Sequence, residues 1–152
     1  MEARFNYGDV EPDSLRVMLQ LQSYVDHSGL DHSLLELMKI RASQVNRCAY
    51  CLDMHSQDAR AAGETEQRIY ALNAWRESPF YSDAERAALE LTEAVTLVAT
   101  LRVPDDLYER VRAHFSAQQY VQLIMAINVI NNWNRLAIAT GAVAGTYHPK
   151  AH

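Results

Sequence analysis

Two cysteines and a histidine are grouped in one short stretch of this sequence, and their types and spacing could support redox or metal chemistry. The stretch NRCAYCLDMH holds the only two cysteines of the chain, Cys48 and Cys51, and His55 follows four residues after the second. On a helix at about 100° per residue the three side chains share one face, and the two cysteine Cα atoms lie about 5 Å apart. That separation is within the range that a disulfide allows, so the pair could close without unfolding a helix.

The surroundings of the two sulfurs favour a nucleophilic thiol. His55 lies one helical turn after Cys51 but two turns after Cys48, so it is expected to neighbour the second sulfur. A helix that starts at or just before Cys48 would add unpaired backbone N–H groups and the positive end of the helix dipole, and both stabilise a thiolate.

The same spacing bears on other roles for the cysteines. Thioredoxin-like chemistry places C-x-x-C after a strand, which is not expected here, and haem attachment would need a histidine where Leu52 stands. A structural zinc usually takes four ligands, and Cys48, Cys51 and His55 supply three. A fourth would come from histidines without paired ligand spacing: His27, His32, His114, His148 or His152. Two inert, buried cysteines are a further alternative.

Glu36, twelve residues before Cys48, has two interpretations. Ser33 and Glu36 have the spacing of a capping box, in which the glutamate needs no catalytic role. If Glu36 is instead partly buried beside the cysteine helix, burial would raise its pKa and suit it to accept a proton near neutrality. Position alone favours the cap.

Composition limits the class of protein. The chain has 152 residues, 49% of them hydrophobic and 22% charged, as in one globular domain. A net charge of -5 with scattered basic residues argues against nucleic acid as a partner. Residues 1–14 do not resemble a secretory signal and no apolar run has the length of a membrane span, so a cytoplasmic protein is expected, without membrane contact. A reducing compartment makes C-x-x-C more consistent with catalysis, redox or metal binding than with structural bridging.

Apolar residues recur at helical spacing along nearly the whole chain, which predicts an all-α, single-domain bundle of about six to seven helices over residues 1–152. Capping residues and helix breakers delimit the segments. The expected helices cover residues 15–28, 33–46, 48–62, 65–75, 83–100, 105–115 and 117–140. Residues 142–152 are expected to form a loose C-terminal tail.

The last expected helix is apolar on every side, which is typical of a helix in a core or between subunits, so a homo-oligomer is predicted. Its polar side chains must be hydrogen-bonded if they are buried, and a network between helices or subunits is the preferred interpretation. These residues are Asn128, Asn131, Asn132, Asn134 and Arg135. A pocket wall that includes Trp133 is the alternative.

The run ELMKIRASQVNRCAYCLDMHSQDARAAG, residues 36–63, resembles the AhpD-like alkylhydroperoxidases of the carboxymuconolactone decarboxylase superfamily. In that family a glutamate stands twelve residues before C-x-x-C and a histidine follows it by four. Those positions hold Glu36, Cys48, Cys51 and His55 here. The segment AINVINNWNRLAIATG is similar to the last helix of the family, so the resemblance spans about residues 15–141.

The resemblance implies an all-helical fold that assembles as trimers or hexamers, and a thiol peroxidase that uses no haem, flavin or metal. Cys51 would attack an organic hydroperoxide, a small-molecule substrate, after losing its proton through His55 and Glu36, and Cys48 would then close the disulfide. An external dithiol, lipoyl or thioredoxin-like, would reduce that disulfide. Tyr50 stands where the best-studied members carry a further histidine, a departure that bears on the proton relay and the rate but not on the dithiol.

Two other functions stay open beside the peroxidase. One is a redox-sensing or oligomerising helical protein whose dithiol switches an interface. The other is a lyase or isomerase of the decarboxylase branch, in which Glu36 and His55 do acid–base work and the cysteines are incidental. Decarboxylases of the superfamily lack the cysteine pair, so its presence argues against that branch.

Overall fold

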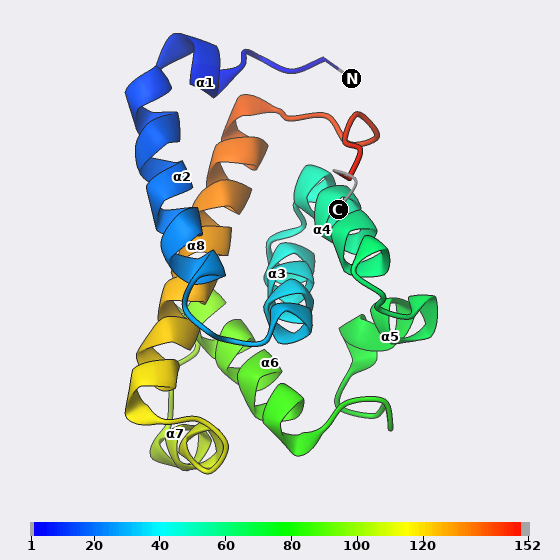
Figure 1. The fold of residues 1–152 in the computed structure, drawn as a ribbon, viewed down its shortest axis with the longest axis vertical. Coiled ribbons are helices and arrows are strands. Elements are labelled where there is room, and N and C mark those ends of the chain that lie inside the picture. Colours follow the sequence, from blue (N-terminus) through cyan, green and yellow to red (C-terminus); the bar gives the residue numbers. More distant parts are fainter. Residues whose placement is uncertain (1, 150–152) are drawn as a thin grey trace.

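The computed structural model describes residues 2–149, and over that range the chain is helical and contains no strand (Figure 1). The predicted all-α bundle is therefore confirmed. Residue 1 and residues 150–152, which include His152, lie outside the described part. The elements are α1 (Tyr7–Val10), α2 (Pro12–Asp26), α3 (His32–Asn46), α4 (Ala49–Ala61), α5 (Glu66–Ala71), the 3-10 helix η1 (Leu72–Ala74), α6 (Asp83–Thr96), α7 (Asp105–Arg112) and α8 (Ala117–Thr140).

Each of the seven predicted helices is present, and the differences lie at their ends. The short helix α1 was not predicted, and the helix expected over residues 65–75 divides into α5 and η1. The helix expected to continue to about residue 100 ends at Thr96, because Leu97 leaves the helical conformation with φ -103° and ψ 29°. No glycine or proline stands at that point to signal the end.

The local capping signals explain why two of these helices begin where they do. The capping boxes of Ser82 with Glu85 and of Ser116 with Gln119 are both formed, so these two predictions are confirmed. Helix α8 ends at Gly141, which has φ 75°, a conformation that glycine adopts without steric cost.

The third predicted capping box, Ser33 with Glu36, is wrong. Helix α3 begins two residues earlier, with Asp31 as its cap: the Asp31 carboxylate accepts a 2.9 Å hydrogen bond from the backbone N–H of Leu34. The Ser33 hydroxyl instead donates to the Glu64 carboxylate at 3.1 Å. Glu36 therefore lies inside the helix and has no capping role.

Helix α3 runs through the centre of the bundle, and every residue from 34 to 40 is buried. One side of the helix packs into an apolar cluster with α2, α6, α7 and α8, and the other side packs against α4, α5 and the segment around Trp75. Any charged side chain in this stretch is taken out of water and needs a partner.

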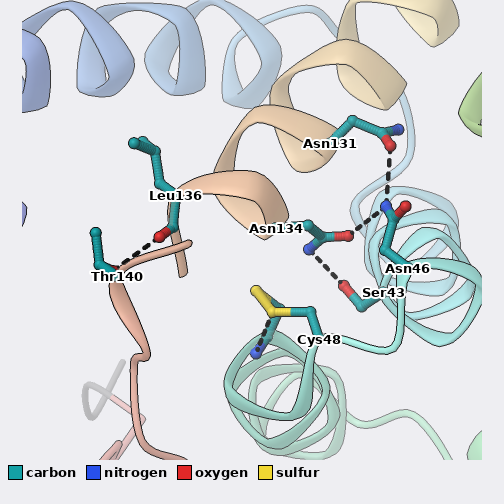
Figure 2. Close-up of a disulfide and its surroundings, with 8 residues drawn as sticks. Ser43, Asn46, Cys48, Asn131, Asn134, Leu136 and Thr140 are labelled. Atoms are coloured by element: carbon teal, nitrogen blue, oxygen red, sulfur yellow. Dashed lines mark hydrogen bonds between the residues drawn. A yellow bond between two sulfur atoms is a disulfide. The ribbon is translucent and has the colours of Figure 1, made fainter. Parts of the chain in front are cut away.

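Helix α3 is joined to α4 by a tight turn at Arg47, whose φ of 58° is left-handed. The turn is held by the side chain of Asn46, which donates to Asn131 at 2.9 Å and to Asn134 at 2.8 Å (Figure 2). Asn134 in turn donates to the Ser43 hydroxyl at 3.0 Å. The predicted network between helices is thus confirmed for Asn131 and Asn134, whereas Asn128, Asn132 and Arg135 are exposed. This network positions the residue that follows the turn, Cys48.

The described residues at the two ends of the chain lie at the same end of the bundle (Figure 1). The backbone N–H of Arg4 donates to the carbonyl of Thr140 at 2.9 Å, which ties the first residues to the end of α8. Among the described helices, none is long and apolar enough to cross a membrane.

The left-handed turn at Arg47 leads to a stability prediction. An exposed arginine at positive φ is strained, so we expect Arg47→Gly to raise the free energy of unfolding by about 0.5–1 kcal/mol. Arg135→Gly, an exposed position inside α8, is the matched control and should lower it by about 1 kcal/mol. Urea unfolding monitored by circular dichroism measures both; equal losses in the two variants would contradict the assignment.

Candidate active site

Cys48 and Cys51 are joined by a disulfide with their Cα atoms 5.4 Å apart, so the predicted disulfide reach is confirmed. Cys48 is the cap of α4 and lies just outside the helix, where its sulfur accepts a 3.4 Å hydrogen bond from the backbone N–H of Cys51. Both cysteines are buried against Ala137 of α8. The first sulfur therefore lies at the positive end of a helix, an environment that stabilises a thiolate.

His55 is buried on α4, one turn after Cys51, and its two ring nitrogens have different surroundings. Nδ1 lies 3.0 Å from Oε2 of Glu36. Nε2 is buried and has no hydrogen-bond partner among the described residues. Because a carboxylate can only accept, Nδ1 is assigned the hydrogen and Nε2 keeps a free lone pair, which is the tautomer of a base.

Lys39 is a third buried member of this group, and the sequence analysis missed it. Its ammonium donates to Oε1 of Glu36 at 2.7 Å, so Lys39 and His55 engage the two oxygens of one carboxylate. The signal was present in the sequence, because residues three apart on a helix are neighbours and Lys39 follows Glu36 by three.

The acidity of Glu36 is the opposite of what burial alone predicts. Burial raises the pKa of the carboxyl, but the hydrogen bond from His55 and the charge of Lys39 outweigh it and lower the pKa to about 2. The expectation of a raised pKa is therefore wrong. Glu36 is an anion at neutral pH and suits the orientation of His55 better than the acceptance of a proton.

One cavity of about 760 Å³ reaches this group. Glu36, Lys39, Cys51 and His55 all line it, whereas Cys48 is not among its lining residues. A molecule in the cavity would therefore meet the second sulfur. The other lining residues are Ala3, Phe5, Asn6, Tyr7, Gln22, Asp26, His32, Tyr50, Met54, Asp58, Trp133, Ala137, Thr140, Ala142 and Tyr147.

Two residues of this lining come from regions to which the sequence analysis gave little weight. Trp133 does form part of the pocket wall, although its neighbours Asn131 and Asn134 belong to the network between helices. Tyr147 lies in the predicted tail, yet its hydroxyl donates to the Asp58 carboxylate at 2.6 Å. Burial and this bond raise the pKa of Tyr147 to about 12. The described part of the tail thus contacts α4, and no pattern in the sequence indicated it.

Glu36, His55 and Asp58 could also be considered as metal ligands, since their ligand atoms lie within 4.8 Å of one another. The ammonium of Lys39 lies 2.7 Å from Glu36 and already neutralises this carboxylate, which disfavours a divalent cation beside it. The three residues considered above as zinc ligands, Cys48, Cys51 and His55, are arranged differently: the two cysteines form a disulfide, and the ring of His55 is turned to Glu36 through Nδ1. The expectation of a metal-free site stays a prediction.

Comparison with known proteins shows which chains this one is similar to. Residues 12–94 match the carboxymuconolactone decarboxylase family. The chain is 51% identical over 141 residues to the uncharacterized protein YdfG of Bacillus subtilis (strain 168), covering 93% of this chain and 96% of YdfG. It is 34% identical over 58 residues to the alkyl hydroperoxide reductase AhpD of Nocardia farcinica (strain IFM 10152), which covers 38% of this chain and 32% of that protein.

A solved structure extends the similarity to the whole fold. The protein of unknown function ATU0492 from Agrobacterium tumefaciens, described as a candidate antioxidant defence protein AhpD, superposes with a TM-score of 0.93 at 41% identity. The match covers 96% of this chain and 100% of that one. The similarity thus extends well beyond the residues 12–94 of the family match.

The buried pair of Glu36 and Lys39 leads to a prediction for stability. Removing one partner leaves the other charge buried and unpaired, so Glu36→Gln or Lys39→Met should each lower the free energy of unfolding by about 3–5 kcal/mol. The double variant should cost less than the sum of the two, because neither charge is then left unpaired. Urea unfolding of the four proteins gives the coupling energy, and strictly additive costs would contradict the pairing.

The low pKa of Glu36 also fixes the direction of a pH effect. The pKa of the Glu36 carboxyl is about 2 in the folded protein and 4.5 ordinarily. The ionised carboxylate therefore contributes fully to the free energy of unfolding above about pH 4.5, and this contribution is lost as the pH falls toward 2. We expect the stability of Glu36→Gln to fall less steeply than that of the wild type over this interval. If the free energy of unfolding of the two proteins falls equally steeply with pH, Glu36 is not the titrating group.

Proposed function

This chain belongs to the carboxymuconolactone decarboxylase family and is AhpD-like, and from that premise we propose that it is a thiol-dependent peroxidase. It would reduce organic hydroperoxides through a dithiol–disulfide cycle of Cys48 and Cys51. The observation that carries the proposal is the position of His55: its Nδ1 is held by Glu36, and its side chain lines the same cavity as Cys51.

The first step needs a thiolate at Cys51 and a base to form it. His55 takes the thiol proton on Nε2, since Nδ1 is already committed to Glu36. The Cys51 thiolate attacks the outer oxygen of the hydroperoxide and the O–O bond breaks, which leaves a sulfenic acid on Cys51 and an alkoxide. The alkoxide takes the proton from His55 and departs as the alcohol.

The second and third steps reset the site. The Cys48 thiol condenses with the sulfenic acid, which forms the disulfide and releases one water. The 5.4 Å separation of the Cα atoms supports this step, because it lies within the range that a disulfide allows. An external dithiol, lipoyl or thioredoxin-like, then reduces the disulfide and is itself oxidised. A reducing compartment such as the cytoplasm supplies such donors.

Glu36 and Lys39 act in this scheme as positioning residues. The ionised Glu36 fixes the tautomer and orientation of His55 and stabilises the imidazolium that forms when the proton arrives. Lys39 keeps Glu36 ionised in a buried position. This assignment differs from a relay in which Glu36 itself accepts the proton.

The two cysteines should have unequal roles, which a trapping experiment tests. We expect Cys51→Ser to abolish reaction with hydroperoxide, because Cys51 is the sulfur that lines the cavity. Cys48→Ser should consume about one equivalent, stop, and hold a sulfenic acid on Cys51 that a dimedone-type probe labels. Labelling of Cys48 in the Cys51→Ser variant would reverse the assignment.

The same assay separates the proposal from its alternatives. His55→Ala should slow the peroxide step at neutral pH and recover part of the rate at higher pH, where the thiolate forms without a base. His114→Ala, an exposed histidine of the loop after α7, is the matched control and should not change the rate. A redox sensor would form the disulfide without sustained turnover in the presence of a dithiol. A decarboxylase-branch lyase would keep its activity after alkylation of both cysteines.

We further propose that the protein is a homo-oligomer, a trimer or hexamer as in the family it resembles. Apolar side chains of the long helix and of its neighbour α2 support this, since Val121, Ile138 and Val17 are each about half exposed in the single chain. Light scattering at micromolar concentration should give a mass of three or six chains. A monomeric mass would contradict the proposal.

A further inference from the structure

The cavity over Cys51 is completed by both ends of the chain, outside the part that carries the reactive residues. Glu36, Cys51 and His55 lie within the residues 12–94 that match the family. Six lining residues lie beyond that stretch at the two ends, and four of them belong to the N-terminal segment, residues 3–7: Ala3, Phe5, Asn6 and Tyr7. The other two, Ala142 and Tyr147, belong to what we call the C-terminal segment, residues 142–147.

The C-terminal segment is held on α4, the helix that carries Cys51 and His55. The backbone N–H of Gly145 donates to Asp53 at 2.8 Å, and the hydroxyl of Tyr147 donates to Asp58 at 2.6 Å. Asp53 and Asp58 are about 1.4 turns apart on this helix. The ring of Tyr147 is thereby placed along the cavity and not in free solution.

The N-terminal segment and α8 also bring aromatic side chains to the cavity. Arg4 ties the N-terminal segment to the end of α8 through its backbone N–H to Thr140 and through Nη1 to the carbonyl of Ala139 at 2.7 Å. Tyr7 then packs against Trp133, with ring centroids 6.4 Å apart. Phe5 and Tyr50 line the same space. The charged groups Glu36 and Lys39 meet the cavity beside His55, so the reactive groups share this space with five aromatic side chains.

The size of this cavity bears on what it binds. At about 760 Å³ it falls in the range of about 300–1,000 Å³ that is typical of sites for small organic molecules. Hydrogen peroxide would fill only a small part of it. A ring-bearing molecule could stack on the aromatic side chains while its polar end reaches Cys51.

We propose that Tyr147 is a specificity-determining residue of this cavity, selecting hydroperoxides that carry an aromatic ring over hydrogen peroxide. The proposal rests on the peroxidase function put forward above and adds the substrate class. The bond to Asp58 holds the ring of Tyr147 in place, so that it contributes a stacking surface to one side of the substrate. The reaction at Cys51 is the same for either substrate, and only binding differs.

The first arm of the test measures peroxidase selectivity. The kcat/KM values for cumene hydroperoxide and hydrogen peroxide are compared in the wild type, Tyr147→Ala and Tyr147→Phe. We expect Tyr147→Ala to lower the ratio of the two values about tenfold through a higher KM for the aromatic substrate, and Tyr147→Phe to keep most of it because the ring remains. Tyr70→Ala, an exposed tyrosine of α5, is the matched control and should leave the ratio unchanged.

The second arm needs no peroxidase activity. Cys51 is alkylated in the reduced Cys48→Ser protein with maleimide or N-phenylmaleimide, and each rate is divided by the rate with free cysteine. When Tyr147→Ala is added to this protein, the normalised alkylation rate with N-phenylmaleimide should fall about tenfold relative to that with maleimide. Circular dichroism confirms that the variant is folded. If it is not folded, Tyr147→Leu, which keeps an apolar side chain without a ring, takes its place.

The two arms distinguish the failure of this inference from the failure of the proposed function. A ratio that does not change in either arm overturns the role of Tyr147 and leaves the peroxidase intact. A change of equal size in Tyr70→Ala overturns it too. If no hydroperoxide is turned over but the labelling ratio falls, the cavity selects aromatic molecules as inferred and the peroxidase function is wrong.

Discussion

The carboxylate of Glu36 is the charge around which this molecule is organised. It lies on the central helix α3, where residues 34–40 are all buried, and an isolated carboxylate there would carry a large desolvation cost. Lys39 offsets that cost from the same helix and His55 from α4. Because both oxygens are engaged, α4 must pack on α3 at the depth where His55 reaches Glu36. The same packing brings Cys51, one turn earlier on α4, to the cavity.

A second set of buried polar contacts places the other end of α4. Asn46 bonds to Asn131 and Asn134 of α8, and the turn at Arg47 follows directly (Figure 2). Cys48 therefore occupies the cap position of α4, where a backbone N–H reaches its sulfur. The ion-paired group and the amide network lie at successive points along α3, and together they set the position of the dithiol relative to its base.

The two cysteines differ in environment although they are three residues apart. Cys48 is buried between the turn and α8, whereas Cys51 lines a cavity that residues from both ends of the chain border. This difference is the basis for proposing that Cys51 reacts with the peroxide and that Cys48 then forms the disulfide. The reactive residues lie within the stretch that matches the family, residues 12–94. The aromatic residues proposed to select the substrate include residues at the two ends of the chain, outside that stretch.

Local features of the sequence determined the helices and the grouping of Cys48, Cys51 and His55, because periodicity, capping boxes and helical spacing act over a few residues. They did not decide the role of Glu36. Asp31 and Ser33 both have the chemistry of a cap, and the choice between them follows from where α3 packs. The low pKa of Glu36 also depends on His55, nineteen residues away, and Tyr147 reaches Asp58 across eighty-nine residues. Such contacts join segments that are distant in the chain, and only tertiary packing brings them together.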